Sequence, residues 1–262
     1  GSKPTLLLEA DASDPAATSN AIAVFNDLAY NVLTEELIGP LKNLSVDSPA
    51  YQPLVHSVYN PLAITAYNIV PGLLGVVLTM TMVFITALAI TKEYERGTME
   101  NLLATPVRPL EVMVGKILPY IIVGYIQVLL ILIIATLLFS VPIQGSVLLL
   151  LVLCLPFIAA NLAVGLTFST IATNQLQAVQ ASIFFFLPSM LLSGFMFPFR
   201  GMPDWAQWIG NLLPLTHFLV IVRGILLKGS GFLEVWPELI RITVFMVVVM
   251  AIGVKRYRQT LD

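Results

Sequence analysis

One segment of the sequence, residues 92–109, concentrates side chains that are suited to binding another molecule. It reads KEYERGTMENLLATPVRP, so acidic and basic residues alternate along it. Thr98 can cap a short helix, and Pro106 would end that helix. With its charges, and with Leu102 and Leu103 for apolar contact, such a helix would suit docking to a soluble partner. A solvated connecting loop is the alternative interpretation of the same residues.

The motifs of several enzyme classes are absent from the sequence. It has no glycine-rich phosphate loop of the form GxxxxGK(S/T), so we do not expect the chain to bind or hydrolyse ATP. It has no HExxH motif, and its long apolar runs contain no Asp or Glu, which disfavours an intramembrane protease or a carboxylate proton relay. We predict no catalytic residue, no metal site and no cofactor bound by the chain itself.

Polar and flexible side chains inside the apolar runs form a second set of candidates. Gln127 and Asn161 are uncharged polar residues, which would hydrogen-bond between helices or line a pathway. Met190 and Phe195 belong to an apolar and aromatic stretch, which would contact an amphipathic molecule, lipid or a partner helix.

A third set lies between the last two apolar runs. It comprises Pro203, Trp205, Pro214, His217 and Arg223. Tryptophan is typical of the membrane–water boundary. An arginine in an apolar segment needs a partner, which Glu234 or Glu238 would supply. We expect His217 to hydrogen-bond at the interface, with a proton-linked switch as the alternative.

The composition identifies the setting in which these residues act. Of 262 residues, 58% are hydrophobic and 11% are charged, and the mean hydropathy is +0.90. Soluble domains carry about 25% charged residues, so a soluble enzyme, a nucleic-acid-binding protein and a disordered regulator are excluded. The net charge of −2 also provides no basic field that would attract nucleic acid. The chain is predicted to be a membrane protein.

The apolar runs predict a mainly α-helical, polytopic transmembrane bundle. About 20 apolar residues are needed to cross the hydrocarbon core of a bilayer. We predict five spans, at residues 69–90, 117–139, 147–171, 178–197 and 239–254. Residues 198–238 are apolar but broken by Pro203, Pro214 and Gly224, so that neither half can span. A re-entrant or interfacial helical hairpin is expected there.

The polar residues 1–68 are predicted to form part of a small α/β domain, separate from a transmembrane domain at 69–262. Pro4–Leu8 is typical of a short strand. A helix is expected after Thr18–Asn20. Its apolar face would include Ile22, Phe25 and Ala29.

The placement of lysine and arginine predicts the orientation in the membrane. Seven of these residues lie in the loop after the first span and in the C-terminal tail, and four lie between the fourth span and the start of the fifth. We therefore expect the loop at 92–116 and the C-terminus to be cytoplasmic, and residues 1–68 to be outside. Because no signal peptide opens the chain, we expect it to be a fragment whose preceding span delivers that domain.

Two separated blocks of sequence resemble the permeases of the ABC-2 transporter family. The first is ERGTMENLL at 95–103, followed by Thr105-Pro106. The second is LSGFMFPF at 192–199, followed by Met202-Pro203, LPLT at 213–216 and RGI at 223–225. The resemblance covers residues 65–262. It is greatest to bacterial inner-membrane permeases with a large periplasmic domain, of the multidrug-exporter subfamily.

The resemblance implies a permease that pairs as a homodimer or heterodimer with two ATPase subunits, which bind ATP and Mg²⁺. The loop at 92–116 would contain the coupling helix that docks to the ATPase. The implied docking residues are Glu95, Arg96, Gly97, Thr98, Glu100, Leu103, Thr105 and Pro106. Membrane lipids are further expected partners, and a periplasmic adaptor is compatible with the domain outside the membrane.

The implied function is export of a small amphipathic molecule or drug, driven by ATP hydrolysis in the partner subunit. Two alternatives stay open on the residues alone. One is a carrier or channel driven by an ion gradient, and the other is an anchor that holds a periplasmic domain without transporting anything.

Overall fold

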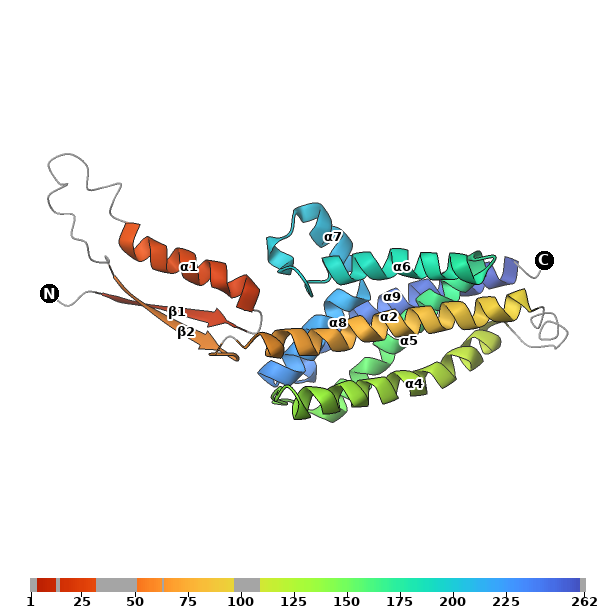
Figure 1. Ribbon diagram of the computed structural model, residues 1–262, viewed down its shortest axis with the longest axis horizontal. Coiled ribbons are helices and arrows are strands. Elements are labelled where there is room, and N and C mark those ends of the chain that lie inside the picture. The colour runs from red at the N-terminus through yellow and green to blue at the C-terminus, as the bar shows by residue number, and fades with distance from the viewer. Residues whose placement is uncertain (1–3, 13–14, 32–50, 63, 97–108, 260–262) are drawn as a thin grey trace. The chain divides into compact units, whose positions relative to one another are not determined.

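A computed structural model of the chain describes residues 4–12, 15–31, 51–62, 64–96 and 109–259 (Figure 1). The chain divides into two compact units, residues 1–68 and 69–262.

The first unit is a small β–α–β arrangement. Strands β1 (Thr5–Asp11) and β2 (Gln52–Val58) pair in parallel, with Thr5 opposite Gln52. Helix α1 (Pro15–Asn31) follows β1 and contacts both strands. Parallel strands need a long crossover connection, which is why a helix lies between them in the sequence. The strand expected at Pro4–Leu8 corresponds to β1, which begins at Thr5 and continues to Asp11, whereas β2 was not expected.

Helix α1 turns its apolar face inward. Ala29 is fully buried, and Ile22 and Phe25 are partly buried. The Tyr51 hydroxyl donates to the Phe25 carbonyl oxygen at 2.8 Å, which ties the helix to the residue before β2. The helix begins at Pro15, earlier than expected, because proline at the first helical position has no N–H to leave unsatisfied.

In the part of the chain that the structure describes, five helices are long and apolar enough to cross a membrane. They are α2 (Thr65–Glu95), α4 (Pro109–Leu137), α5 (Val147–Ile171), α6 (Gln175–Leu192) and α9 (Phe232–Gln259). The predicted helical bundle with five spans is confirmed. Helices α2 and α9 extend beyond the predicted spans 69–90 and 239–254, because a helix can continue past the apolar core into polar surroundings.

Side-chain caps determine where α5 and α6 begin. Ser146 Oγ accepts a hydrogen bond at 3.3 Å from the backbone N–H three residues later. Asn174 Oδ1 likewise accepts from the Gln177 N–H at 2.9 Å. Each cap satisfies a backbone donor that has no partner inside the helix. The fourth span therefore begins at Gln175 rather than at Ala178.

Helix α5 lies at the centre of the second unit. The ring of its Phe157 stacks on Phe218, with centroids 3.8 Å apart and the planes 1° from parallel. A Cβ at Gly165 would come within 2.4 Å of the Val83 carbonyl oxygen of α2, so the two backbones are in direct contact. Helix α9 packs along α5 as well.

Helices α4, α6 and α9 expose apolar side chains to the surroundings. Ile126 of α4, Phe184 of α6 and Val244 of α9 are all exposed. Water would solvate such surfaces poorly, whereas the hydrocarbon of a bilayer or another apolar helix would cover them.

Between α6 and α9 the chain forms a bent helix pair, in the region where a re-entrant or interfacial hairpin is expected. A short 3-10 turn, η2 (Phe199–Gly201), leads to α7 (Asp204–Leu212). Helix α8 (Pro214–Arg223) follows and continues as a π-helix, η3 (Gly224–Lys228). Helix α7 lies at 83° to α8 and η3. Pro214 stands at the start of α8, where proline is well tolerated.

Hydrogen bonds between the helices define two ends of this unit. At the charged end, the last turn of α2 contacts the beginnings of α4 and α6 through Glu93 and Glu95. At the hairpin end, α7 and α8 contact the beginning of α9 through His217.

Candidate functional site: the two ends of the helical bundle

At the charged end, α2 is tied to α4 by an ion pair. Lys116 Nζ donates to a carboxylate oxygen of Glu93. The Lys116 side chain is largely buried, while that of Glu93 is half exposed. The ion pair joins the two helices on either side of the segment 97–108, which lies outside the described residues.

Glu95, the last residue of α2, makes a two-point contact with the first residue of α6. Its Oε1 accepts from the Gln175 backbone N–H at 2.7 Å, and its Oε2 accepts from the Gln175 side-chain amide. These hydrogen bonds hold the pKa of the Glu95 carboxyl below its ordinary value, because they stabilise the ionised form. The last turn of α2 is therefore joined to α6 as well as to α4.

Small apolar residues pack together near this contact. Ala87 of α2, Ala172 of the turn before α6 and Ala178 of α6 form a buried cluster. Small side chains allow helices to approach closely in a membrane. The ends of α2 and α6 thus meet through apolar contact as well as through Glu95.

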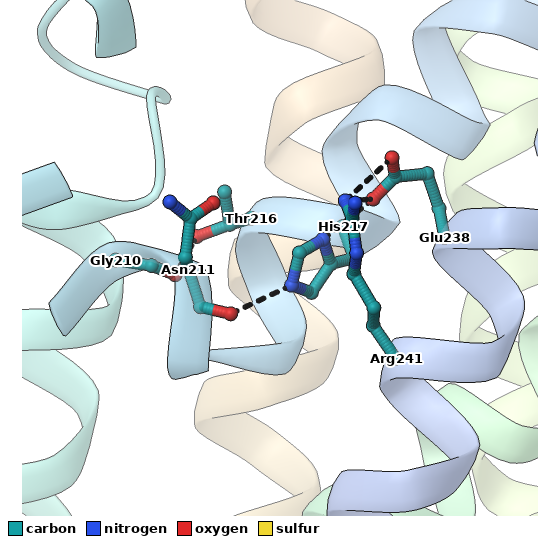
Figure 2. Close-up of polar contacts among 6 residues, drawn as sticks. All are labelled: Gly210, Asn211, Thr216, His217, Glu238 and Arg241. Atoms are coloured by element: carbon teal, nitrogen blue, oxygen red, sulfur yellow. Dashed lines mark hydrogen bonds and ion pairs between the residues drawn. The ribbon is translucent and has the colours of Figure 1, made fainter. Parts of the chain in front are cut away.

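At the hairpin end, His217 of α8 connects three helices (Figure 2). Its Nδ1 lies 2.5 Å from Glu238 Oε2 of α9, and its Nε2 lies 2.8 Å from the Asn211 carbonyl oxygen of α7. Arg241 Nη1 donates to both oxygens of Glu238 at 2.9 Å. Both ring nitrogens of His217 lie against oxygen atoms, so the imidazole ring is held from two sides.

The bend between α7 and α8 is fixed by tight packing. Thr216 Oγ1 donates to the Gly210 carbonyl oxygen at 2.6 Å. A Cβ at Gly210 would come within 2.4 Å of the Leu192 carbonyl oxygen, so the backbone of α7 rests directly on the end of α6. Gly194, with φ of 85°, adopts the left-handed conformation that lets the chain turn after α6.

Arg223 and the π-helix complete the hairpin end. Arg223 Nη1 donates to the Gly194 carbonyl oxygen at 3.3 Å. The loop between α4 and α5 reaches η3, because the Gln144 N–H donates to the Leu226 carbonyl oxygen at 3.0 Å. A carbonyl oxygen of the π-helix η3 thus accepts a hydrogen bond from the loop between α4 and α5.

Helix α7 presents an apolar face away from the unit. Its buried residues are Ala206 and Gly210. Trp205, Trp208 and Leu212 are exposed. Their spacing places them on one side of the helix, a pattern typical of helices that lie in a membrane interface.

The sequence matches the model of the ABC-2 family transporter proteins over residues 3–255. The chain belongs to the ABC-2 family. The match includes both ends of the bundle, so the charged end and the bent helix pair are parts of one ABC-2 domain.

Proteins with similar sequences are named as transport permeases, which agrees with this family. The chain is 34% identical over 173 residues to the probable multidrug ABC transporter permease YbhS of Escherichia coli K12, covering 66% of this chain and 46% of YbhS. It is 30% identical over 186 residues to the similarly named YbhR of that strain, covering 71% and 50%. It is 31% identical over 185 residues to its inner membrane transport permease YhhJ, covering 70% and 50%. The chain spans about half the length of these relatives.

Of the first ABC-2 block, the structure describes only the beginning. Glu95 contacts Gln175, and the exposed Arg96 donates its backbone N–H to the Lys92 carbonyl oxygen at 3.2 Å. The other predicted docking residues lie outside the described residues. They are Gly97, Thr98, Glu100, Leu103, Thr105 and Pro106.

The polar residues predicted inside the spans lie in different places. Thr81 Oγ1 of α2 donates to Gln127 Oε1 of α4 at 2.7 Å, so Gln127 joins two helices. Asn161 is fully buried, and its Nδ2 donates to the Phe157 carbonyl oxygen of its own helix at 2.9 Å. The structure does not bring these two residues into a single polar site.

Met190 and Phe195 both pack against the main apolar core of the ABC-2 domain. The ring of Phe195 lies so close to Gly72 of α2 that a Cβ there would be 2.6 Å from it. Pro203 directly precedes α7 and leads into the exposed Trp205. At the hairpin end, the structure therefore groups Phe195, His217 and Arg223 around the starts of α2 and α9.

Sequence reasoning missed the partners of the acidic residues at the charged end. Neither Lys116 nor Gln175 is singled out by its sequence context, and Gln175 precedes the predicted span 178–197. The signal available was the Asn174 cap, which marks Gln175 as the first residue of a helix. Glu234 or Glu238 was expected to partner Arg223, and of these two the structure places Glu238 against His217 and Arg241.

Proposed function

We propose that this chain forms the membrane-spanning part of a permease subunit in an ABC exporter, with ATP hydrolysed by a separate subunit. Membership of the ABC-2 family supports this function, and the names of YbhS and YbhR include multidrug transport. The observation that carries the proposal is the charged end. There, Glu93 and Glu95 join α2 to α4 and α6 at the start of the ABC-2 signature, of which Glu95 is the first residue.

The charged end is the face on which an ATPase would dock. Lys92, Arg96 and Lys116 belong to it, and α9 ends on the same side with Lys255 and Arg256. Basic residues next to the membrane favour the cytoplasmic side. Residues 1–68 would then form a periplasmic unit, and the hairpin end would face outward.

The complete transporter would contain two ATPase subunits and two permease subunits. ATP and Mg²⁺ would bind to the ATPase, since the sequence of this chain has no phosphate-binding loop. The second permease subunit would be a copy of this protein or a relative. Lipids would surround the exposed faces of α4, α6 and α9. A periplasmic adaptor would bind to residues 1–68.

The ATPase can drive the permease because it contacts the coupling segment differently in its open and its ATP-closed state. The docking residues are assigned to the segment from Glu95 to Pro106, and ATP-driven closure of the ATPase would displace that segment. A partner shifts a conformational equilibrium only when it binds the two states with different free energies. The displaced segment would favour one arrangement of the spans, and a small amphipathic molecule or drug would leave the cytoplasm. A carrier driven by an ion gradient is not favoured by membership of this family.

The test uses the permease in its full natural length, co-produced with an ATPase encoded beside it. We expect the two proteins to purify together and to export the amphipathic dye Hoechst 33342 from vesicles in an ATP-dependent way. The variant Gly97→Pro should retain vanadate-sensitive hydrolysis and lose dye export at least tenfold, because proline would disturb the coupling segment. Gly231→Ala is the control, since a Cβ at Gly231 would meet no atom within 4 Å in the part of the chain that the structure describes.

Two results would contradict this function. A permease that retains no ATPase on purification would not be the membrane subunit of such a complex. Dye export that persists without ATP and follows an imposed ion gradient would identify a secondary carrier instead.

A further inference from the structure

We propose that Glu95 and Gln175 form a joint through which α6 follows the end of α2, so that Glu95 is a positioning residue inside the permease. The proposal rests on the proposed function, because it describes how a displacement of the coupling segment reaches the membrane helices. It changes the role of Glu95 alone among the docking residues that the resemblance implies, because its carboxylate is assigned to α6 and not to the surface of the ATPase.

Both carboxylate oxygens of Glu95 are used by a single residue of α6. One accepts from the Gln175 backbone N–H at 2.7 Å and the other from the Gln175 amide. Hydrogen bonds to an ionised acceptor are stronger than neutral ones, and two parallel bonds also fix the orientation of the groups. The contact therefore resists both separation and rotation of the two helix ends.

Glu95 interacts with α6 as a helix, in addition to its contact with one side chain. The Gln175 N–H belongs to the first turn of α6, where backbone donors lack partners inside the helix. Asn174 satisfies the N–H of Gln177, and Glu95 satisfies that of Gln175. A carboxylate at this position also interacts favourably with the positive end of the helix dipole.

The second observation is that α6 is held at both of its ends. At the charged end, Ala178 packs with Ala87 of α2 beside the Glu95 contact. At the hairpin end, Gly210 of α7 rests on the Leu192 carbonyl oxygen, the last residue of α6. Between these points α6 exposes Phe184 and Leu187. Helix α6 can thus act as a rod that carries a displacement from Glu95 to α7.

The ion pair between Glu93 and Lys116 serves as an internal comparison. It joins α2 to α4 through one oxygen and one flexible lysine. The lysine stem can reorient without moving its helix, whereas the Glu95 contact includes a backbone N–H of α6. We therefore assign the transmission to Glu95 and not to Glu93.

The variant Gln175→Pro removes both donors to Glu95 and leaves α6 able to form. Proline is favoured at the first helical position, and Asn174 already has the extended backbone (φ −149°, ψ 164°) that a residue before proline requires. Glu95→Ala removes the acceptor instead. Gln177→Ala is the matched control, because among the described residues the Gln177 Oε1 accepts only from Thr173, in its own turn.

The experiment uses the full-length permease with its ATPase in nanodiscs. A bimane dye is placed on α7 at Leu212→Cys, an exposed position, with Cys154→Ala and with any further cysteine of the complex replaced. We measure retention of the ATPase, its hydrolysis rate, and the change in bimane fluorescence when ATP and vanadate trap the complex. Without further changes, the labelled protein should respond to trapping.

If Glu95 and Gln175 form a joint, Gln175→Pro and Glu95→Ala each reduce the change in bimane fluorescence at least fivefold while the ATPase stays bound. The double variant then shows no further loss of that change. Gln177→Ala responds normally. If Glu95→Ala releases the ATPase and Gln175→Pro does not alter the response, Glu95 is a docking residue and the joint is refuted. A normal response in both single variants also refutes it. A permease that never retains the ATPase contradicts the proposed function instead, which separates the two failures.

Discussion

The two ends of the bundle are built in different ways. At the hairpin end, contacts are buried and close: His217 is packed between α7 and α9, and Gly210 leaves no space for a side chain. At the charged end, helices are joined in part through exposed side chains such as Glu95, and a Cβ added at Gly115 of α4 would meet no atom of the described residues within 4 Å. We expect the hairpin end, whose polar groups are bonded to each other in a close-packed interior, to move as a rigid body. A partner protein can displace the charged end more easily, because exposed polar contacts help to hold it.

The largest contrast should appear when the same methyl group is added at each end. Gly210→Ala places a Cβ 2.4 Å from the Leu192 carbonyl oxygen, a backbone atom that cannot move aside. We expect a loss of about 3 kcal/mol, the upper part of the usual range for overpacking. Gly115→Ala should instead gain up to about 1 kcal/mol, because alanine is the better helix former. Thermal unfolding in detergent measures both, and equal effects would show that the two ends are packed alike.

A smaller effect is expected from the polar contacts of the hairpin end. His217→Ala removes the contacts to Glu238 and to the Asn211 carbonyl oxygen. Hydrogen bonds to charged groups contribute about 1.5–3 kcal/mol, and Glu238 retains Arg241 as a partner, so we expect a loss of about 2 kcal/mol. Val220→Ala, an exposed position on the same helix, should change stability little. A neutral result for His217→Ala would mean that this end does not depend on its buried polar contacts.

The spans could be predicted because one local property defines them. A run of about 20 apolar residues specifies a crossing helix without reference to the rest of the chain. Helix α5 matches its predicted range, 147–171, because Ser146 caps its start. Strand β2 was missed for a related reason. It contains Pro53 and has as its partner β1, which lies far away in the sequence, so no local pattern marks it strongly.

The candidate site was only partly predictable, because its contacts join distant residues. Glu95 was named from its motif, but Gln175 lies 80 positions away and no periodicity connects the two. Arg223 was recognised as a charge that needs a partner, with Glu234 or Glu238 as the candidate. Which charge meets which depends on the bend of 83° between α7 and α8, and hydropathy alone does not specify that angle.

The smallest effect concerns pH at the charged end. Hydrogen bonds from Gln175 hold the pKa of Glu95 below its ordinary value of 4.5. A group with a lowered pKa in the folded state stabilises its contact above the ordinary value, and that contribution is lost as the pH falls through the lowered pKa. Spin labels are placed at Lys92→Cys on α2 and Leu176→Cys on α6, with Cys154 and any further cysteine of the protein replaced by alanine. The distribution of distances between the labels should therefore stay narrow from pH 7 to about pH 5. The distance distribution should broaden only below pH 4.5, the ordinary pKa of a glutamate carboxyl. In the Gln175→Pro variant, the distance distribution should be broad throughout this pH range and should not change on acidification. Broadening that begins near pH 6 in the unmodified pair would show that a group other than Glu95 holds the two helices together.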